Sequence, residues 1–331
     1  MSITGEQLRA PFPWFGGKRR AAALIWDRLG DVANFVDPFM GSAAVLLARP
    51  SEPRIETVND ADALLANFWR AVQQAPDEVA THADWPVNEA DLHARHLWLV
   101  RRKPEIRAAC MADPDWCDPK AAGWWVWGLS QWIGSGWCDD KALTLQAPRC
   151  NGLGGQGIHG AKVPNKMPKV GLNGVGVSSL SGVHGEGMAQ ASGIHAWFAA
   201  LQHRLRRVRV CCGDWKRVTG DSVILGNGVT GILLDPPYDG HADLYAEGNE
   251  VFRETAAWAV EKGADPRLRI ILCGYEGHFA PPPGWETVEW KANGGYGNVA
   301  GNLNKHRERL WCSPACLRPA PPAQLDLLGA R

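Results

Sequence analysis

The chain has no excess of charge of either sign. Its 331 residues contain 35 Lys and Arg against 35 Asp and Glu, so the formal net charge is zero. A strongly basic chain would itself indicate a polyanionic partner, and that signal is missing. Any surface for such a partner must therefore be a local basic patch.

Long apolar runs are also missing. No stretch approaches the roughly 18 continuous apolar residues of a membrane span. The N-terminal residues 1–9 are polar and lack the apolar run that is typical of a secretory signal. We therefore expect a soluble, intracellular protein with no membrane partner.

The nine cysteines show no paired C-x-x-C spacing. Cys211 and Cys212 are adjacent, and three residues separate Cys312 from Cys316. This pattern favours reduced structural thiols over a zinc site or a disulfide framework, so no metal is expected.

Helix and strand signals alternate over residues 10–75 and 195–313. The expected strands cover residues 34–37, 56–59, 208–212, 229–234 and 268–273. A helix expected over residues 42–48 joins the first two strands into a βαβ unit. The simplest architecture is α/β: a doubly wound, mostly parallel sheet built from residues 1–75 and 195–313.

Residues 76–194 interrupt this framework and predict a helical and loop-rich insertion. Residues 76–150 read mainly as helix and carry six of the 17 Trp, between Trp116 and Trp137. Residues 151–193 hold twelve of the 37 Gly and show no regular period, which predicts a long loop region. Residues 314–331 are rich in Pro and Ala and predict a frayed tail.

The sharpest motif is Asp235-Pro236-Pro237-Tyr238, directly after an apolar run. Asp235 offers a carboxylate acceptor, the Pro236 carbonyl offers a second, and two prolines stiffen the backbone that holds them. Tyr238 adds an aromatic face on which a base could stack. Fixed acceptors suit the amine of an aromatic ring, whose delocalised lone pair makes it a poor nucleophile. A plain strand-to-turn exit is the alternative for this tetrapeptide.

A second motif lies near the N-terminus, at Phe12-Pro13-Trp14-Phe15-Gly16-Gly17-Lys18. The glycines permit close approach of a ligand to the backbone, and Lys18 offers a cation for a carboxylate. Walker A is excluded, because position 12 is Phe rather than Gly and position 19 is Arg rather than Ser or Thr. An ordinary Gly-Gly turn with a solvated lysine remains the alternative.

Two further polar turns follow the first two expected strands. Asp37-Pro38-Phe39-Met40-Gly41-Ser42 predicts a strand, a tight turn and a helix start, with Ser42 as the N-cap. It lacks G-x-G-x-x-G, which disfavours a dinucleotide cradle. Asn59-Asp60 ends the next strand, where an acid commonly binds ribose hydroxyls, although a surface turn would look the same.

In this order the motifs resemble those of the Dam-type (D12 class, alpha order) DNA adenine-N6 methyltransferases. The resemblance covers about residues 11–70 and 205–313 and is weak in the insertion. It implies a Rossmann-like fold and methyl transfer from S-adenosylmethionine to the N6 amine of adenine in double-stranded DNA. The target base would be rotated out of the duplex.

The resemblance also implies roles for individual residues. Trp14 and Lys18 would contact the methionine end of the cofactor, Asp60 its ribose, and Asp214 the region of its adenine. The implied cofactor-binding residues are Trp14, Gly16, Gly17, Lys18, Asp37, Phe39, Gly41, Ser42, Asp60, Asp214 and Asp235. The implied catalytic residues, which would hold the flipped base, are Asp235, Pro236, Pro237 and Tyr238. Ala43 departs from the Gly of many relatives and should crowd its turn slightly.

Target recognition is expected in the insertion. Lys162, Lys166 and Lys169 in the Gly-rich zone, and Arg101 and Arg102 before it, could meet DNA phosphates. Solvated lysines would have the same sequence signature. The tryptophans of the insertion could act as wedges, but core packing explains them better.

Several alternatives stay open at this point. They are N4-cytosine methylation, methylation of RNA or a free nucleotide, and a catalytically silent DNA-binding relative. The resemblance places the protein in the cytoplasm of a bacterial cell or a phage-infected host, where a cognate restriction endonuclease could exist.

Overall fold

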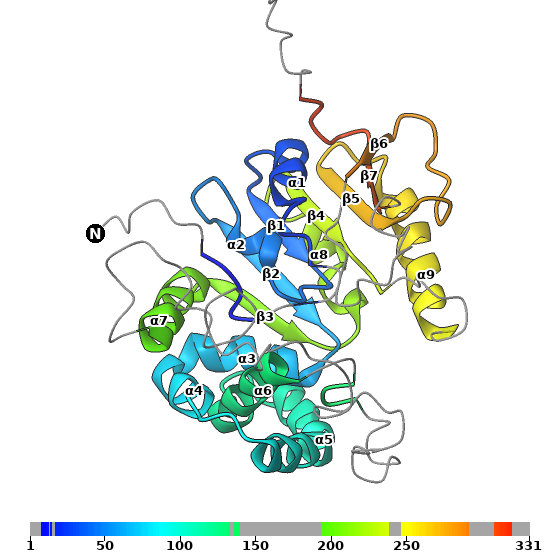
Figure 1. Cartoon of the computed structure of the whole chain (residues 1–331). Coiled ribbons are helices and arrows are strands. Elements are labelled where there is room, and N and C mark those ends of the chain that lie inside the picture. The colour runs from blue at the N-terminus through cyan, green and yellow to red at the C-terminus, as the bar shows by residue number, and fades with distance from the viewer. Residues whose placement is uncertain are drawn as a thin grey trace, which may run out of the picture.

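The computed structural model describes residues 8–12, 14, 17–132, 136–139, 193–237, 246–290 and 308–319. At the centre lies a seven-stranded sheet with the order β3-β2-β1-β4-β5-β7-β6 (Figure 1). The strands are β1 (Asn34–Asp37), β2 (Ile55–Asp60), β3 (Val208–Cys212), β4 (Thr230–Leu234), β5 (Leu268–Tyr275), β6 (Glu286–Glu289) and β7 (Glu308–Cys312). The five strands from β3 to β5 are parallel, and β7 runs antiparallel to both β5 and β6.

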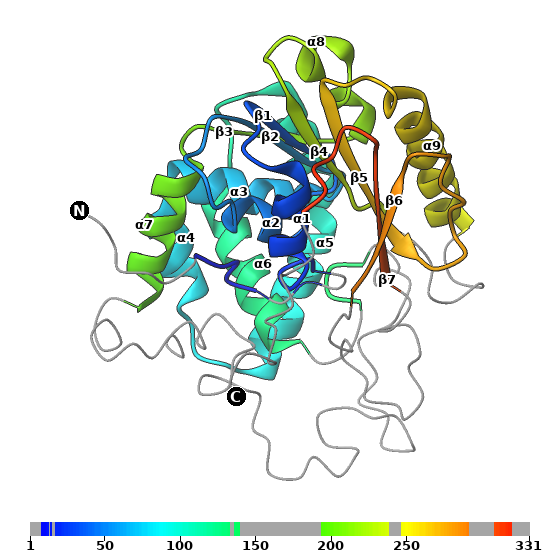
Figure 2. The ribbon, with the colours of Figure 1, turned by 90° about the horizontal axis from the view of Figure 1, so that it is seen from above.

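All five expected strands are confirmed, with ends that differ by at most two residues. The short strand β6 was not predicted, because Glu286–Glu289 alternates polar and apolar residues over only four positions. The mostly parallel sheet with helices on both faces confirms the Rossmann-like α/β class (Figure 2).

Helices flank the sheet throughout the described residues. They are α1 (Ala22–Leu29), α2 (Ala44–Leu47), α3 (Ala63–Gln74), α4 (Pro76–Ala83), α5 (Glu89–Ala112), α6 (Pro119–Gln131), α7 (Gly193–Leu205), α8 (Asp221–Ile224) and α9 (Ala246–Lys262), with a 3-10 turn, η3, at Trp215–Val218. Three of them have a side-chain N-cap: Asp62, Asn88 and Asp118 accept hydrogen bonds from backbone N–H groups at the starts of α3, α5 and α6.

Alternation along the strands divides the core between the two faces. Phe35 and Leu233 pack with α1, α2 and α3, whereas Val36 and Ile232 pack with α8 and α9 on the opposite face. Because successive residues point to opposite sides, all five residues of the central strand β4 are buried, as expected for a sheet covered on both faces.

The helices between residues 76 and 131 share the first of these cores. Helices α4, α5 and α6 pack against α3, and α4 also packs against α7 (Figures 1 and 2). Trp125 and Trp127 are 2% and 1% exposed, so the core-packing interpretation of these tryptophans is confirmed. Phe68 of α3 contacts both Trp125 of α6 and Phe198 of α7, which joins these three helices.

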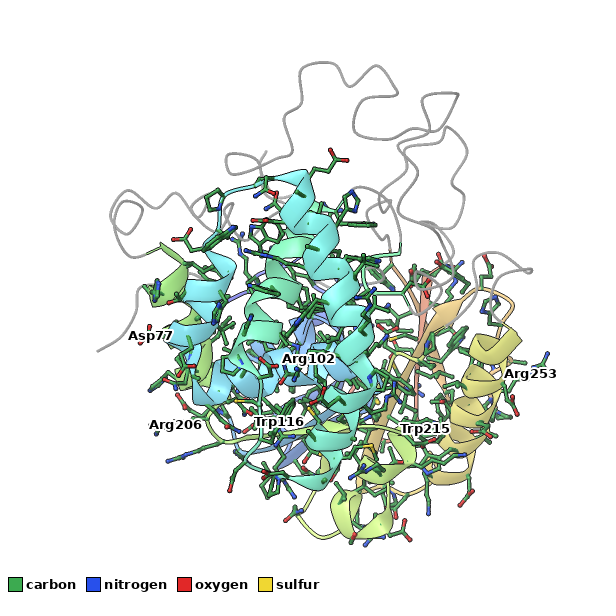
Figure 3. All side chains as sticks on the ribbon, turned by 90° about the horizontal axis from the view of Figure 1, so that it is seen from below. Asp77, Arg102, Trp116, Arg206, Trp215 and Arg253 are labelled. Carbon is green, nitrogen blue, oxygen red and sulfur yellow. The ribbon has the colours of Figure 1, made fainter. Side chains whose placement is uncertain are left out.

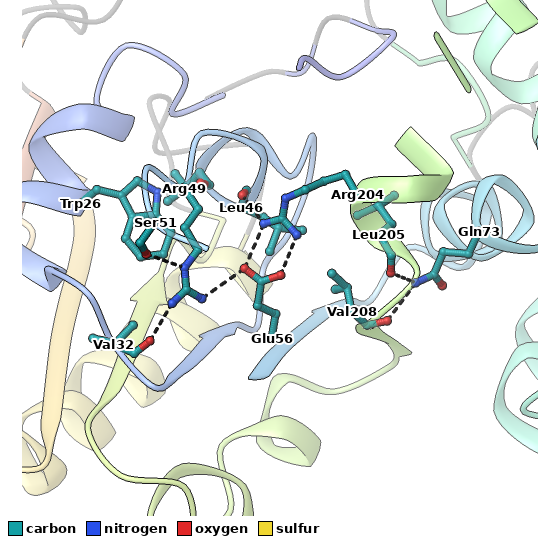
Figure 4. A network of polar contacts seen from close by, with 11 residues as sticks. Trp26, Val32, Leu46, Arg49, Ser51, Glu56, Gln73, Arg204, Leu205 and Val208 are labelled. Carbon is teal, nitrogen blue, oxygen red and sulfur yellow. Dashed lines mark hydrogen bonds and ion pairs between the residues drawn. The ribbon is translucent and has the colours of Figure 1, made fainter. Parts of the chain in front are cut away.

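An ion cluster at the amino edge of the parallel strands ties this framework together (Figure 4). We call Arg49, Glu56 and Arg204 the amino-edge cluster. Arg204 donates to both Glu56 oxygens at 2.6 and 2.9 Å, and Arg49 donates to Oε1 at 3.2 Å. Arg204 also reaches the carbonyl of Leu46 at 2.8 Å, so the cluster links β2, α2 and α7. This structural role explains Arg204, which belongs to a basic stretch of the sequence.

One local prediction needs correction. Ser42 is not the N-cap of the helix that follows: α2 begins at Ala44, and its N-cap is Ala43 in a left-handed conformation. In the described part of the chain, no helix is long and apolar enough to cross a membrane. The eight cysteines described there are free thiols.

Candidate functional site

The predicted site residues gather where the parallel strands end. Asp37 ends β1, Asp60 ends β2 and Asp235 follows β4 directly. Since these strands are parallel neighbours, their carboxyl ends lie along one edge of the sheet, which is the usual ligand edge of such folds.

The N-terminal Gly-Lys turn meets the Asp-Pro-Pro loop at this edge. Lys18 Nζ lies 2.8 Å from Asp235 Oδ1, and the two side chains are 3% and 18% exposed. The two segments are 217 positions apart in the sequence, yet they form one ion pair. Lys18 was expected to face a cofactor carboxylate, whereas here it contacts the carboxylate of the predicted catalytic loop.

Two more acids surround the same lysine. Glu308 Oε2 lies 3.9 Å from Lys18 Nζ, and Asp37 is 2% exposed nearby. We call Lys18, Asp37, Asp235 and Glu308 the carboxyl-edge cluster. It contains three carboxyl groups and one ammonium group.

Burial and mutual repulsion set the ionisation of this cluster. Burial, followed by the neighbouring charge of Asp235, raises the pKa of Asp37 well above its usual range. Burial also raises the pKa of Asp235, although Lys18 opposes the shift. Burial alone would lower the pKa of Lys18, but the acidic groups around it, Asp235 foremost, raise it above its ordinary value. The cluster therefore disfavours a second uncompensated negative charge and leaves room for a positive one.

The turn after β1 packs against the N-terminal motif. Gly41 has φ +48°, and a Cβ at this position would lie 2.5 Å from the indole nitrogen of Trp14. A Cβ on Gly17 would lie 3.6 Å from Ser42 Oγ. The close approach that requires Gly41 is thus to the Trp14 ring, whereas the sequence suggested a ligand.

Ala43, in the same turn, has φ +51°. This left-handed conformation favours Gly, which explains why Gly is common there in the family that the sequence resembles. The predicted crowding is therefore a backbone effect, and the Ala43 side chain itself is fully buried.

Asp60 is held in a fixed orientation at the end of β2. Its Oδ2 accepts the Gly41 N–H at 3.0 Å, and its Oδ1 accepts the Asp62 N–H at 2.9 Å. Burial raises the pKa of Asp60 to about 6, against the opposing effect of these backbone donors. The neighbouring Asn59 side chain donates to the carbonyls of Pro38 and Gly213, so it joins the ends of three strands. Sequence reasoning noted Asn59 but gave it no role.

The turn after β3 places Asp214 and Trp215 beside these strand ends. Asp214 is exposed, and it caps η3 by accepting the Lys216 N–H at 2.8 Å. Trp215 lies 6.3 Å from Phe39, centroid to centroid. Phe39 of the β1 turn therefore shares an aromatic surface with the β3 turn.

The expected DNA contacts are only partly described. Arg102 lies on α5, far from the helix that carries Arg253 (Figure 3). Its guanidinium covers the Trp98 ring at 4.9 Å and lies 3.7 Å from Asp118, so its charge is partly used within the helical layer. Arg101 is exposed on the same helix. Gly16, Lys162, Lys166, Lys169 and Tyr238 lie outside the described residues.

Glu308 was missed as a site residue. The sequence shows it only as the polar start of the run Glu308–Cys312, and in a parallel sheet the ligand edge lies after the strands rather than before them. Because β7 is antiparallel, its first residue lies at the edge where β5 ends, opposite Tyr275. Among the described residues, no group of three His, Cys, Asp or Glu side chains is arranged to hold a metal ion.

Comparison with known proteins adds an independent finding. A family model, D12 class N6 adenine-specific DNA methyltransferase, matches residues 14–92. No curated protein matches the chain. The matched segment runs from Trp14 through β1 and β2 into α5, so Lys18 lies inside it and Asp235 outside it. The match confirms the resemblance drawn from the sequence motifs: residues 14–92 are similar to the D12 class N6 adenine-specific DNA methyltransferases, enzymes that methylate adenine in DNA.

Proposed function

We propose that this enzyme transfers a methyl group from S-adenosylmethionine to the N6 amine of a flipped adenine at a specific DNA sequence. One observation carries the proposal: Lys18 of the matched segment lies 2.8 Å from Asp235 of the Asp-Pro-Pro loop. The turn proposed to bind the cofactor and the loop proposed to bind the target base thereby share one edge of the sheet.

The carboxyl edge suits S-adenosylmethionine in its donor groups and in its charge. Asp60, fixed by two backbone N–H groups, offers acceptor capacity for ribose hydroxyls. The surplus of carboxyl groups over ammonium groups in the carboxyl-edge cluster suits a ligand that carries a positive charge. When bound, the cofactor would supply an electrophilic methyl group on its sulfonium.

Asp235 and Pro236 would orient and activate the adenine amine. The carboxylate and the backbone carbonyl would accept hydrogen bonds from the two amine N–H groups. These bonds would draw the delocalised lone pair back towards the nitrogen. The acceptors need not move during the reaction, so most of the acceleration would come from placement and preorganisation. Tyr238 remains the predicted stacking partner of the base.

Residues 1–75 and 195–313 would form the catalytic domain, and residues 76–194 would recognise the target. Recognition requires side chains that reach base edges, with phosphate contacts to fix the register. Arg101, exposed on α5, and the three lysines of the Gly-rich zone are the proposed phosphate contacts. A base that is stacked in the duplex cannot reach the strand ends, so the target adenine would be rotated out.

The decisive experiment measures the product. Duplex DNA incubated with the protein and tritiated S-adenosylmethionine should yield N6-methyladenine on hydrolysis and mass analysis. Asp235→Ala should abolish the transfer and leave cofactor binding measurable by calorimetry. Expression in a methylation-free host, followed by sequencing that maps methylated adenines, would then give the recognition site.

Other outcomes would point to other functions. N4-methylcytosine as the product would overturn the adenine assignment, and methylation of RNA in preference to duplex DNA would overturn the DNA assignment. Failure of the wild-type protein to bind S-adenosylmethionine would favour a catalytically silent DNA-binding protein. Incorporation by Asp235→Ala equal to that of wild type would remove Asp235 from its assigned role.

A further inference from the structure

Glu308 is a buried carboxylate of the site to which the roles above assign no task. Its side chain is 5% exposed, and Oε2 lies 3.9 Å from Lys18 Nζ. It reaches the site from β7, on the side away from β1, because the antiparallel register places it opposite Tyr275 at the end of β5.

We propose that Glu308 is a positioning residue, which holds the Lys18 ammonium from the β7 side so that Lys18 fixes Asp235 in the orientation that accepts the adenine amine. This inference rests on the proposed function, because it assigns the acceptor role to Asp235.

A single contact cannot fix a lysine. The ammonium is a compact charge on a flexible four-carbon stem with three rotatable donors. The 2.8 Å contact with Asp235 fixes the distance between the ammonium and that carboxylate. The second carboxylate, Glu308 on another strand, fixes the direction in which the lysine side chain points. The Trp290 ring, whose centroid lies 5.9 Å from Lys18 Nζ, bounds the ammonium further.

The orientation of Asp235 matters because only part of it faces outward. Oδ1, the oxygen nearest Lys18, is fully buried. The 18% of the side chain that is exposed therefore belongs to its other atoms, among which Oδ2 is the remaining acceptor. If Lys18 is loosened, the carboxylate can rotate and the acceptor loses its fixed direction.

A double-mutant cycle tests this coupling. Glu308→Gln should lower kcat about tenfold or more, because a misplaced reacting group is costly, while the KM for DNA and for S-adenosylmethionine changes less than twofold. In a Lys18→Gln background the same change at Glu308 should alter kcat less than twofold. Glu308→Asp, which keeps the charge, should retain more activity than Glu308→Gln. Glu289→Gln is the matched control: Glu289 lies on the neighbouring strand β6 with a side chain that is 77% exposed, and its loss should leave kcat unchanged.

A readout that does not need activity accompanies the cycle. In protein labelled with ¹³C-aspartate, the carboxyl resonance assigned through Asp235→Asn should titrate at higher pH in Glu308→Gln than in wild type, because Lys18, which lowers the pKa of Asp235, is less firmly held. Equal effects of Glu308→Gln in the wild-type and Lys18→Gln backgrounds would overturn the proposal, as would an unchanged titration of Asp235. If Glu308→Gln does not fold, Glu308→Asp carries the same cycle. An inactive wild-type protein would instead refute the proposed function, and the titration would still test the coupling.

Discussion

The two edges of the sheet hold buried charges in opposite ways. At the amino edge, two arginines share one glutamate, and the arginines also donate to the backbone carbonyls of Val32 and Leu46. At the carboxyl edge, one lysine faces three carboxyl groups, and two of them have a raised pKa. The first arrangement uses its bonds to connect elements of the fold. The second crowds three acids around one cation and raises the pKa values of two of them, which is typical of a functional site.

The difference predicts that activity and stability respond to different clusters. Removing one partner of a buried ion pair destabilises the fold, because the other partner is left charged and desolvated. Active-site residues are often unfavourable for stability. Replacing a charged active-site residue by a neutral one therefore lowers activity without lowering the free energy of unfolding. The following variants test this separation, from the largest expected effect to the smallest.

Asp235→Asn should give the largest effect, confined to activity. Methyl transfer should fall by about 10²–10³, as for the loss of one preorganised group. Burial raises the pKa of Asp235, so its contribution to stability is present below the unfolded pKa and is lost as pH rises through the folded one. At pH 7.5 the neutral amide should therefore leave the free energy of unfolding equal to or above that of wild type.

Chemical denaturation and incorporation of tritiated methyl groups measure the two quantities for Asp235→Asn. A variant that loses activity only in proportion to its loss of folded protein would erase the distinction between the two clusters.

Glu56→Gln should show the reverse pattern. It leaves Arg204 and Arg49 without their shared carboxylate in a site where the Glu56 side chain is 2% exposed, which should cost about 3 kcal/mol of unfolding free energy. Methyl transfer per folded molecule should stay within twofold of wild type. The control is Glu254→Gln, which removes an ion pair with Lys216 whose side chains are about half exposed, and should cost less than about 1 kcal/mol. Equal losses in urea titrations of the two variants would contradict the structural role of the amino-edge cluster.

The sequence predicted the strands and several site residues, but not the ion pairs that distinguish the two edges. The strands were predictable because apolar runs such as residues 230–234 end at polar turns, and those turns located Asp37, Asp60 and Asp235. The family resemblance placed Lys18 and Asp235 in one site, but their direct ion pair was not predictable, because no local rule joins positions 217 residues apart. Glu308 was missed because the direction of β7, which brings its first residue to the site, depends on tertiary pairing. Arg204 reads as one of several arginines until Glu56 is placed beside it.

The pH dependence of cofactor binding should report on Asp60. Its pKa of about 6 means that the carboxylate, which would accept ribose hydroxyls, is increasingly protonated below that pH. The affinity for S-adenosylmethionine should thus fall by up to tenfold per pH unit below pH 6 and level off above it. Calorimetry from pH 5 to pH 8 should show this slope in wild type, with net proton release at low pH, and no slope in Asp60→Asn. A slope that persists in Asp60→Asn would assign the dependence to another group, such as Asp37.

Ala43→Gly should have the smallest effect, since two opposing terms nearly cancel. Gly removes the strain of a left-handed Ala, about 1 kcal/mol, and loses the burial of one methyl group, about 0.8 kcal/mol. The unfolding free energy should therefore change by less than about 0.5 kcal/mol, in contrast to Ala44→Gly one residue later, where ordinary helix propensity predicts a loss of about 1 kcal/mol. Denaturant midpoints compare the two variants directly. An equal loss of unfolding free energy in both variants would contradict this prediction. It would show that the left-handed conformation of Ala43 carries no strain.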